Sequence, residues 1–240
     1  MDPAQDKRMP TTDRSWARFF LYRKEVLKTT WTLRLLVLGC IVVLPLLTRG
    51  LWAGALARGL VCDEQQRNGG GVDAIVIENF DVNYLVFQAV RELRRKGLTA
   101  RIVVPVEASP DAAQPNLVSA EIVEVMARIA RIGELTMVPV RETEPISLNT
   151  AYQVRDFLRK EGIQSVALVA PAFRSRRSAM IYGTVLAPAG ISMRCVPVFG
   201  EQTPATWLDT WHGVEQVLEQ YIKLEYYRLF ILPRARATSG

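Results

Sequence analysis

Residues 165–179 read Ser-Val-Ala-Leu-Val-Ala-Pro-Ala-Phe-Arg-Ser-Arg-Arg-Ser-Ala, and this stretch decides the fold. Its first five residues form an apolar run typical of a strand buried on both faces. The small and basic residues that follow lead into a helical pattern. A second run, Ser-Leu-Asn-Thr-Ala-Tyr-Gln at 147–153, opens another amphipathic helix. Strand, polar loop and helix in this order is where α/β folds bind ligands, because loops and helix N-termini meet there.

The same unit recurs on both sides of this stretch. The pattern predicts strands at 72–77, 100–104, 135–140, 165–169 and 191–198, and helices at 82–96, 119–132, 149–160 and 176–186. Strands alternating with helices of this length predict right-handed βαβ units and a parallel sheet. We therefore expect a Rossmann-like, three-layer α/β domain with about five strands. One long helix at 205–232 should follow the sheet and end at Pro233.

The N-terminal part of the chain has a different character. Residues 35–47 are apolar and uncharged, and extension to 31–48 gives a segment long enough to span a bilayer. Trp31 and Trp52 are suited to the two membrane interfaces. A buried core helix or a cleaved signal peptide are the alternatives, but about thirty mostly polar residues come first and no clear cleavage site follows. We expect a single retained transmembrane helix.

Charge is distributed unevenly along the 240 residues, which carry a net charge of +6. Up to Arg34 there are eight basic and four acidic residues, which leaves 22 basic and 20 acidic residues beyond it. By the positive-inside rule we expect the N-terminus inside and the main domain outside the cytoplasmic (inner) membrane, in the periplasm. The near-neutral domain argues against a nucleic-acid partner.

These features divide the chain into five parts. We expect a cytoplasmic basic tail with a juxtamembrane helix at 1–30 and the transmembrane helix at 31–48. A membrane-proximal helix and linker at 49–71 precede the α/β domain with its C-terminal helix at 72–233, and a tail occupies 234–240. The lipid bilayer is thus the first expected partner.

Cysteine, histidine and glycine patterns assign no cofactor. Cys62 and Cys195 could pair in an oxidising compartment, although the sequence does not show that they are close. The single histidine, His212, and the absence of a Cys-x-x-Cys motif give no metal site. Glycine-rich nucleotide motifs and the Gly-x-Ser-x-Gly motif are also absent. The cofactor therefore stays unknown.

Polar residues gather at the ends of the predicted strands. Glu78 follows the first strand, Arg174 and Arg177 follow the fourth, and Asn149 and Thr150 stand at a helix start. Ligands of open parallel sheets bind beyond the carboxyl ends of the strands. Guanidinium groups beside a helix N-terminus favour an anion such as phosphate, pyrophosphate or carboxylate. We therefore predict an anion site made by Arg174, Arg177, Asn149 and Thr150.

Other roles for these residues stay open. Arg177 could instead neutralise a partly buried acid, either Glu78 or Glu107. Glu78 could act in acid–base chemistry, hold a cation or form an ion pair. Ser147 or Asn149 could cap the helix that begins there.

Several short motifs resemble those of the family called domain of unknown function 218, the YdcF-, SanA- and ElyC-like bacterial envelope proteins. The similar motifs are Asp-Ala-Ile-Val-Ile at 73–77, Ser-Ala-Glu at 119–121, Ser-Leu-Asn-Thr-Ala at 147–151, Ala-Phe-Arg-Ser-Arg-Arg at 172–177, and the Glu-Gln-Tyr-Ile-Lys-Leu-Glu-Tyr-Tyr run at 219–227. The resemblance covers about residues 50–233. It implies an N-terminal anchor, a Rossmann-like domain and a role in cell-envelope or surface-polysaccharide biology.

The polar site departs from the family pattern. Glu78-Asn79 replaces a Gly-Gly pair, and Arg174 replaces a histidine, whereas Arg177 and the Asn149-Thr150 pair are retained. The resemblance thus implies binding of an anionic envelope or polysaccharide precursor. The alternative is a non-catalytic scaffold subunit of a membrane protein complex with a degenerate site. Whether the protein is an enzyme is left open.

Overall fold

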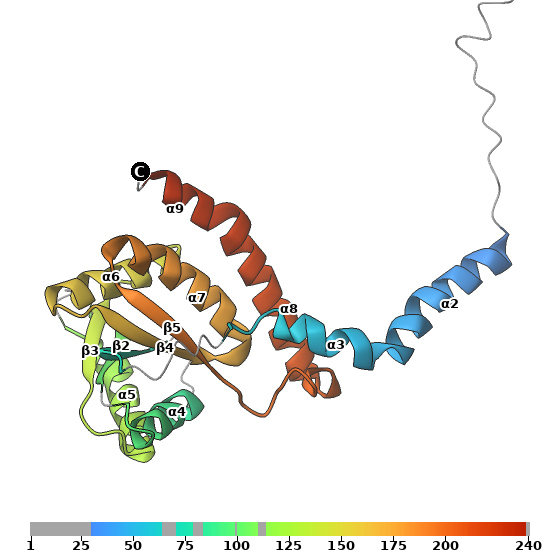
Figure 1. Cartoon of the computed structure of the whole chain (residues 1–240). Helices are drawn as coiled ribbons and strands as arrows, with labels where there is room; N and C mark the ends of the chain where they lie inside the picture. The colour runs from blue at the N-terminus through green and yellow to red at the C-terminus, as the bar shows by residue number, and fades with distance from the viewer. Residues whose placement is uncertain (1–29, 64–70, 79–83, 99, 110–113, 239–240) are drawn as a thin grey trace, which may run out of the picture. The chain divides into compact units, whose positions relative to one another are not determined.

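The computed structural model describes residues 30–63, 71–78, 84–98, 100–109 and 114–238 (Figure 1). The chain forms two compact units, Met1–Thr48 and Arg49–Gly240. The predicted juxtamembrane helix and nearly all of the basic tail lie outside the described residues.

Helix α2, Trp31–Leu47, makes up the described part of the first unit. It buries none of its 17 residues and contains Pro45. Its last turn is closed by Thr48, whose hydroxyl donates to the Leu44 carbonyl over 2.7 Å. Among the described residues, no single helix has both the length and the hydropathy of a membrane span. Helices α2 and α3 (Arg49–Arg58), which are separated by a bend, meet that criterion when they are taken together.

The second unit is built on a five-stranded parallel sheet. Its strands are β1 (Ala74–Ile77), β2 (Arg101–Glu107), β3 (Thr136–Val140), β4 (Ser165–Pro171) and β5 (Ser192–Val198). All pairings are parallel and the order is β3-β2-β1-β4-β5. The predicted α/β class and the five parallel strands are confirmed.

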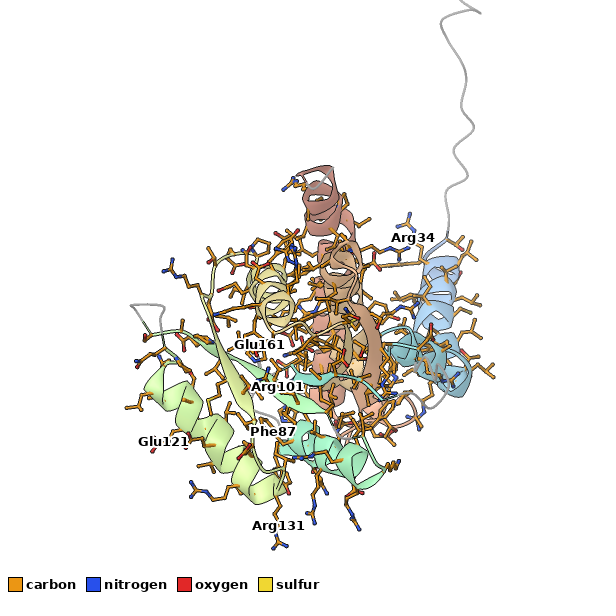
Figure 2. All side chains as sticks on the ribbon, turned by 60° about the vertical axis from the view of Figure 1, so that its left-hand side comes forward. Arg34, Phe87, Arg101, Glu121, Arg131 and Glu161 are labelled. Atoms are coloured by element: carbon orange, nitrogen blue, oxygen red, sulfur yellow. A yellow bond between two sulfur atoms is a disulfide. The ribbon has the colours of Figure 1, made fainter. Side chains whose placement is uncertain are left out.

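Helices cover both faces of this sheet (Figure 1). Ile75 and Ile77 of β1 belong to one core with α4 (Tyr84–Arg95) and α5 (Leu117–Ala130). The buried Phe87 of α4 is part of the same core. Ala74 and Val76 pack on the opposite face, with α6 (Ile146–Lys160) and α7 (Ala172–Leu186). In Figure 2 Phe87 lies on the sheet side of α4. Alternate residues of one strand therefore serve two cores, because side chains of a strand point to opposite faces.

Asp73 fastens the start of β1 to β4. Its carboxylate accepts hydrogen bonds from the amides of Gln164 (3.0 Å) and Ser165 (2.9 Å) and from the Ser165 hydroxyl (2.9 Å). These bonds, the one from the Gln164 amide first, lower the pKa of Asp73 below its ordinary value. The strand begins at Ala74, directly after Asp73 and two residues after the predicted start.

The C-terminal helical region differs from its prediction at both ends. After a short turn, η3 (Trp207–Asp209), helix α8 spans Trp211–Tyr226 and continues through a π-helical turn, η4 (Tyr227–Ile231), into α9 (Leu232–Thr238). The helix begins at 211 rather than 205 because the hydroxyl of Thr210 caps it, accepting from the Gly213 amide over 3.1 Å. It also passes Pro233, which directly follows the π-helical turn, where the regular i→i−4 hydrogen-bond ladder is already interrupted.

Residues 49–62 are attached to the domain along their length. The Trp207 indole donates to the Ala53 carbonyl over 3.0 Å, and the Tyr221 hydroxyl donates to the Leu56 carbonyl over 2.5 Å. A disulfide then joins Cys62 to Cys195 of β5, which are 133 positions apart in sequence. The pairing that the sequence left open is present.

Candidate functional site

Helix α7 begins at Ala172, four residues before the predicted start at 176. Arg174, Arg177 and Ser178 are therefore helical residues spaced by three and four positions, which places them on one face of α7. That face is buried, with Arg174 9% and Arg177 7% exposed. Arg176 lies off that face and is exposed. The basic loop expected from the sequence is the first turn and a half of a helix.

Glu78 stands where the strand order changes direction. It directly follows β1, and its amide donates to the Val169 carbonyl of the neighbouring β4 over 2.9 Å. The helix after β1 covers one face of the sheet and the helix after β4 covers the other, so the carboxyl ends of these two strands form the topological switch point. Switch points are where open α/β sheets bind ligands.

The Glu78 carboxylate is buried and held by α7. The Ser178 hydroxyl lies 2.7 Å from each carboxylate oxygen and donates to them. Burial raises the pKa of Glu78 above its ordinary value, while Arg174, the Ser178 hydrogen bond and Arg177 act in the opposite direction. Arg177 and Glu78 thus attract each other electrostatically, as one of the alternatives from the sequence expected. Glu107, the other acid considered for it, is exposed, and its carboxylate accepts from Ser119 over 3.2 Å.

Two buried polar groups beside Glu78 have incomplete hydrogen bonding. The Arg177 guanidinium carbon lies 5.6 Å from the centre of the Tyr227 ring, a cation–π contact. Within the described part of the chain, neither the Arg177 Nε nor the Tyr182 hydroxyl has a hydrogen-bond partner. Burial, with a smaller contribution from Glu78, raises the pKa of Tyr182. Buried polar atoms without partners mark positions for a water or a ligand oxygen.

The C-terminal helix also reaches this cluster. Tyr227 is buried against Arg177, and Glu219 of α8 lies in the field of both inward-facing arginines. The pKa of Glu219 is lowered first by its hydrogen bond from Lys223 and then by the charges of Lys223, Arg174 and Arg177. Sequence reasoning missed these two residues of α8 and η4 because no local motif links them to α7.

Asn149 and Thr150 both lie near the start of α6. The helix begins at Ile146, with Pro145 before it and no side-chain cap, so the prediction that Ser147 or Asn149 caps it is wrong. The fixed φ of Pro145 suits the residue that leads into a helix. The Asn149 amide instead donates to the Thr143 carbonyl over 2.9 Å, and Thr150 is fully buried within α6.

The N-terminus of α7 is partly covered by the chain that follows α3. The Arg176 amide donates to the Leu60 carbonyl over 3.0 Å, and the Ser175 hydroxyl accepts from the Cys62 amide over 2.9 Å. The Arg176 amide and the Ser175 hydroxyl, which lie at the helix N-terminus where the sequence predicted an anion to bind, are therefore already bonded to this segment.

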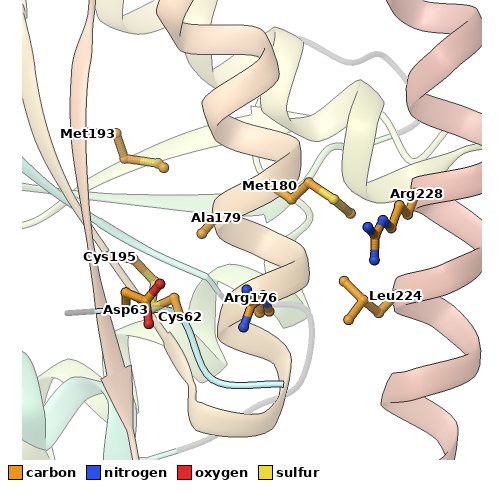
Figure 3. A pocket seen from close by; sticks show the side chains of 9 residues that line it. All are labelled: Cys62, Asp63, Arg176, Ala179, Met180, Met193, Cys195, Leu224 and Arg228. Carbon is orange, nitrogen blue, oxygen red and sulfur yellow. A yellow bond between two sulfur atoms is a disulfide. The ribbon is translucent and has the colours of Figure 1, made fainter. Parts of the chain in front are cut away.

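An open pocket of about 450 Å³ lies beside α7, away from Glu78. Figure 3 shows the disulfide on one side of α7, and Met180, Leu224 and Arg228 on the side that faces α8. Arg176 and Arg228 bring positive charge to its rim, and Asp63 brings negative charge. The pocket is thus mixed in charge, and neither Arg174 nor Arg177 lines it.

The chemistry of the switch point follows from its groups. Arg177 can donate to an anionic oxygen, and Glu78, with its raised pKa, can carry a proton. Within the described ranges, His, Cys, Asp and Glu side chains nowhere gather in threes as a metal site would need.

Comparisons with known proteins place the chain in no family. No known protein family matches its sequence, and no curated protein matches it. A solved structure with some similarity is the N,N'-diacetylchitobiose deacetylase from Pyrococcus horikoshii in complex with an inhibitor. The identity is 13%, the match covers 71% of this chain and 77% of the deacetylase, and the TM-score is 0.34. At this level of similarity nothing about activity follows from the match.

Proposed function

We propose that this protein is a membrane-tethered α/β protein whose domain lies outside the cytoplasmic membrane and binds an anionic group of a cell-envelope or polysaccharide precursor. The observation that carries the proposal is the buried Arg177 beside Glu78 at the switch point, with its Nε lacking a hydrogen-bond partner among the described residues. An anionic ligand oxygen would complete that hydrogen bonding with a charge-assisted bond.

The tether is supported by α2. All its residues are exposed to solvent in the structure, including Leu36, Leu38 and Ile41, each about 60% exposed. So many apolar side chains on all sides of one helix favour a lipid environment. The basic excess up to Arg34 favours an inside N-terminus.

The disulfide supports export. Cys62 and Cys195 are bonded inside the domain, whereas Cys40 of α2 is free. Structural disulfides persist in oxidising compartments and are rare in the cytosol. A topology reporter fused after Gly240 tests the orientation, and activity of a reporter that works only in the cytoplasm would contradict it.

The ligand class rests on the site and on the resemblance to domain of unknown function 218. That resemblance favours an envelope precursor, and retention of Arg177 within it favours an anion. Phosphorylated sugars and lipids of the envelope carry the charge that such a residue recognises. Catalysis is not part of the proposal.

Binding of sugar phosphate and pyrophosphate to the full chain in detergent, measured by calorimetry, tests this function. Arg177→Lys keeps the charge but removes the guanidinium fork, and Arg176→Ala is the matched control because Arg176 is exposed one position away. A hydrogen bond to a charged group contributes about 1.5–3 kcal/mol, so Arg177→Lys should weaken binding roughly 10- to 100-fold. Arg176→Ala should bind like the natural chain. Equal affinities for all three proteins would overturn the assignment of Arg177.

A second candidate is the scaffold subunit of a membrane protein complex. The outward face of α5 favours it, since Leu117, Val118 and Ile129 are between 55% and 81% exposed. Exposed apolar patches of this kind mark protein contacts. If this role is the correct one, Val118→Glu should release a partner that co-purifies with the natural chain, while Arg177→Lys should leave that partner bound.

A further inference from the structure

Helix α8 and the turn η4 are apolar on two opposite faces. The inner face buries Val217, Leu224 and Tyr227 against the domain. The outer face exposes a row that we call the outer stripe, with exposed fractions from 51% at Tyr226 to 73% at Trp211. The outer stripe consists of Trp211, Leu218, Ile222, Tyr226, Leu229 and Phe230. A surface helix normally has a polar outer face, so a helix that is apolar on both sides needs a second cover.

Three carboxylates lie in or beside the outer stripe, and the exposed Glu215 stands in the row itself, four residues after Trp211 and three before Leu218. Glu219 pairs with Lys223, Glu225 with Arg228 over 3.6 Å, and Glu215 lies 3.7 Å from His212. Two of these three carboxylates thus have a permanently charged neighbour one helical turn away, whereas His212 is charged only when it is protonated. Three of the six stripe residues are aromatic, and Trp and Tyr are the side chains enriched where a membrane meets water.

The chain connection decides which surface is available to this stripe. Thr48 alone separates α2 from α3, so the start of α3 stays beside the membrane wherever α2 crosses it. Helix α3 is in turn fixed to the region where α8 begins. The Trp207 indole donates to the Ala53 carbonyl and lies edge-on to Trp52, with ring centres 6.4 Å apart. The outer stripe starts four residues after Trp207.

We propose that the outer stripe of α8 and η4 lies on the surface of the bilayer that α2 enters, with its aromatic and aliphatic side chains at the boundary between headgroups and acyl chains. This inference rests on the tether of the proposed function. The 21 residues from Trp211 to Ile231 form a helical rod of about 30 Å, and a helix of that length with an apolar outer row can lie flat in the interface. The inner face of the same helix carries Tyr227, which contacts Arg177. The anion site would then lie about one helix diameter from the lipid, suited to a lipid-linked ligand.

Spin labels on the full chain in nanodiscs of phosphatidylethanolamine and phosphatidylglycerol test this placement. Cys40→Ser removes the free thiol, and a nitroxide is then attached in turn at Ile222→Cys, at Val42→Cys in α2 and at Glu121→Cys. Glu121 is the aqueous control, since it lies on α5, on the other face of the sheet, and is exposed. Power saturation compares the accessibility of each label to oxygen, which enters lipid, and to a nickel chelate, which stays in water.

We expect a raised oxygen accessibility and a loss of nickel accessibility at 222 and 42, but not at 121. An aqueous label at 222 with a lipid-exposed label at 42 would overturn the inference and leave the tether standing. Aqueous labels at both positions would overturn the tether itself. Dipolar broadening at 222 that vanishes on dilution with unlabelled protein would overturn the inference in favour of a second copy covering the stripe.

Discussion

The disulfide offers the most direct quantitative test of how the domain is held together. Cys62→Ser combined with Cys195→Ser removes a crosslink between residues 133 positions apart. In the chain-entropy account, a closed loop of that length lowers the entropy of the unfolded chain enough to stabilise the fold by about 5 kcal/mol. A typical domain has about 5–15 kcal/mol in all, so the loss would be a large fraction of the stability.

Urea unfolding of the full chain in mild detergent, followed by tryptophan fluorescence, measures this loss. With a denaturant slope near 2–3 kcal/mol per molar, the midpoint of the double variant should fall by about 2 M. Trp207 is a suitable internal reporter, since it is buried against α3 near the crosslinked segment. The natural chain unfolded with a thiol reductant should match the double variant.

The control is Cys40→Ser, which removes the free cysteine of α2 and should leave the midpoint unchanged. If the free energy of unfolding of the double variant lies within about 0.5 kcal/mol of that of the natural chain, the reasoning is refuted. The crosslink would then not restrict the unfolded chain as the entropy account requires.

Three further predictions concern the site and the packing of α8. Ser178→Ala removes the hydroxyl that donates to the Glu78 carboxylate and should lower the free energy of unfolding by about 1.5–3 kcal/mol at neutral pH; an unchanged urea midpoint would contradict this. The raised pKa of Glu78 in the folded protein makes stability depend on pH: the contribution of this group is complete below its ordinary pKa of 4.5 and is lost as the pH rises through the folded pKa. Over that window the natural chain should lose stability relative to Glu78→Gln, which does not titrate. Urea midpoints of the two proteins, compared across pH, measure this loss. Gly213→Ala would place a Cβ 2.2 Å from the Trp207 carbonyl oxygen and should destabilise by about 1–3 kcal/mol. Gly183→Ala, whose Cβ would meet only the Met193 methyl at 3.8 Å, should instead raise the thermal midpoint, and equal effects of the two substitutions would argue against the packing at Gly213.

The sheet was predictable because its signal is local. Each strand is a short apolar run buried on both faces, as in 165–169, and the helices between the runs leave only a parallel arrangement. Element ends were less predictable, since they depend on single contacts such as the Thr210 cap or the Asp73 bridge to β4.

The site was predictable only in part. The rule that ligands lie beyond strand ends selected Glu78, Arg174 and Arg177, which the structure groups. Because α7 was predicted to start at 176, Arg174 was not placed on the same helix face as Arg177. The spacing of Arg174, Arg177 and Ser178 does indicate one common face once the helix starts at Ala172. The contact of Tyr227 with Arg177 joins residues fifty positions apart, and no periodicity reports a contact between two separate helices.

The position of the disulfide has a mechanical consequence. Tension applied to the chain upstream of Cys62 reaches the domain at Cys195 on the edge strand, at the first turn of α7 and at the packing of α3, before it can reach Ala74. The central strand β1, which pairs on both sides and carries Glu78 at its end, is therefore shielded from a pull through the N-terminal segment. A pull on this segment would therefore reach the Glu78 site through α7, whose Ser178 holds the carboxylate, and not through the backbone of β1.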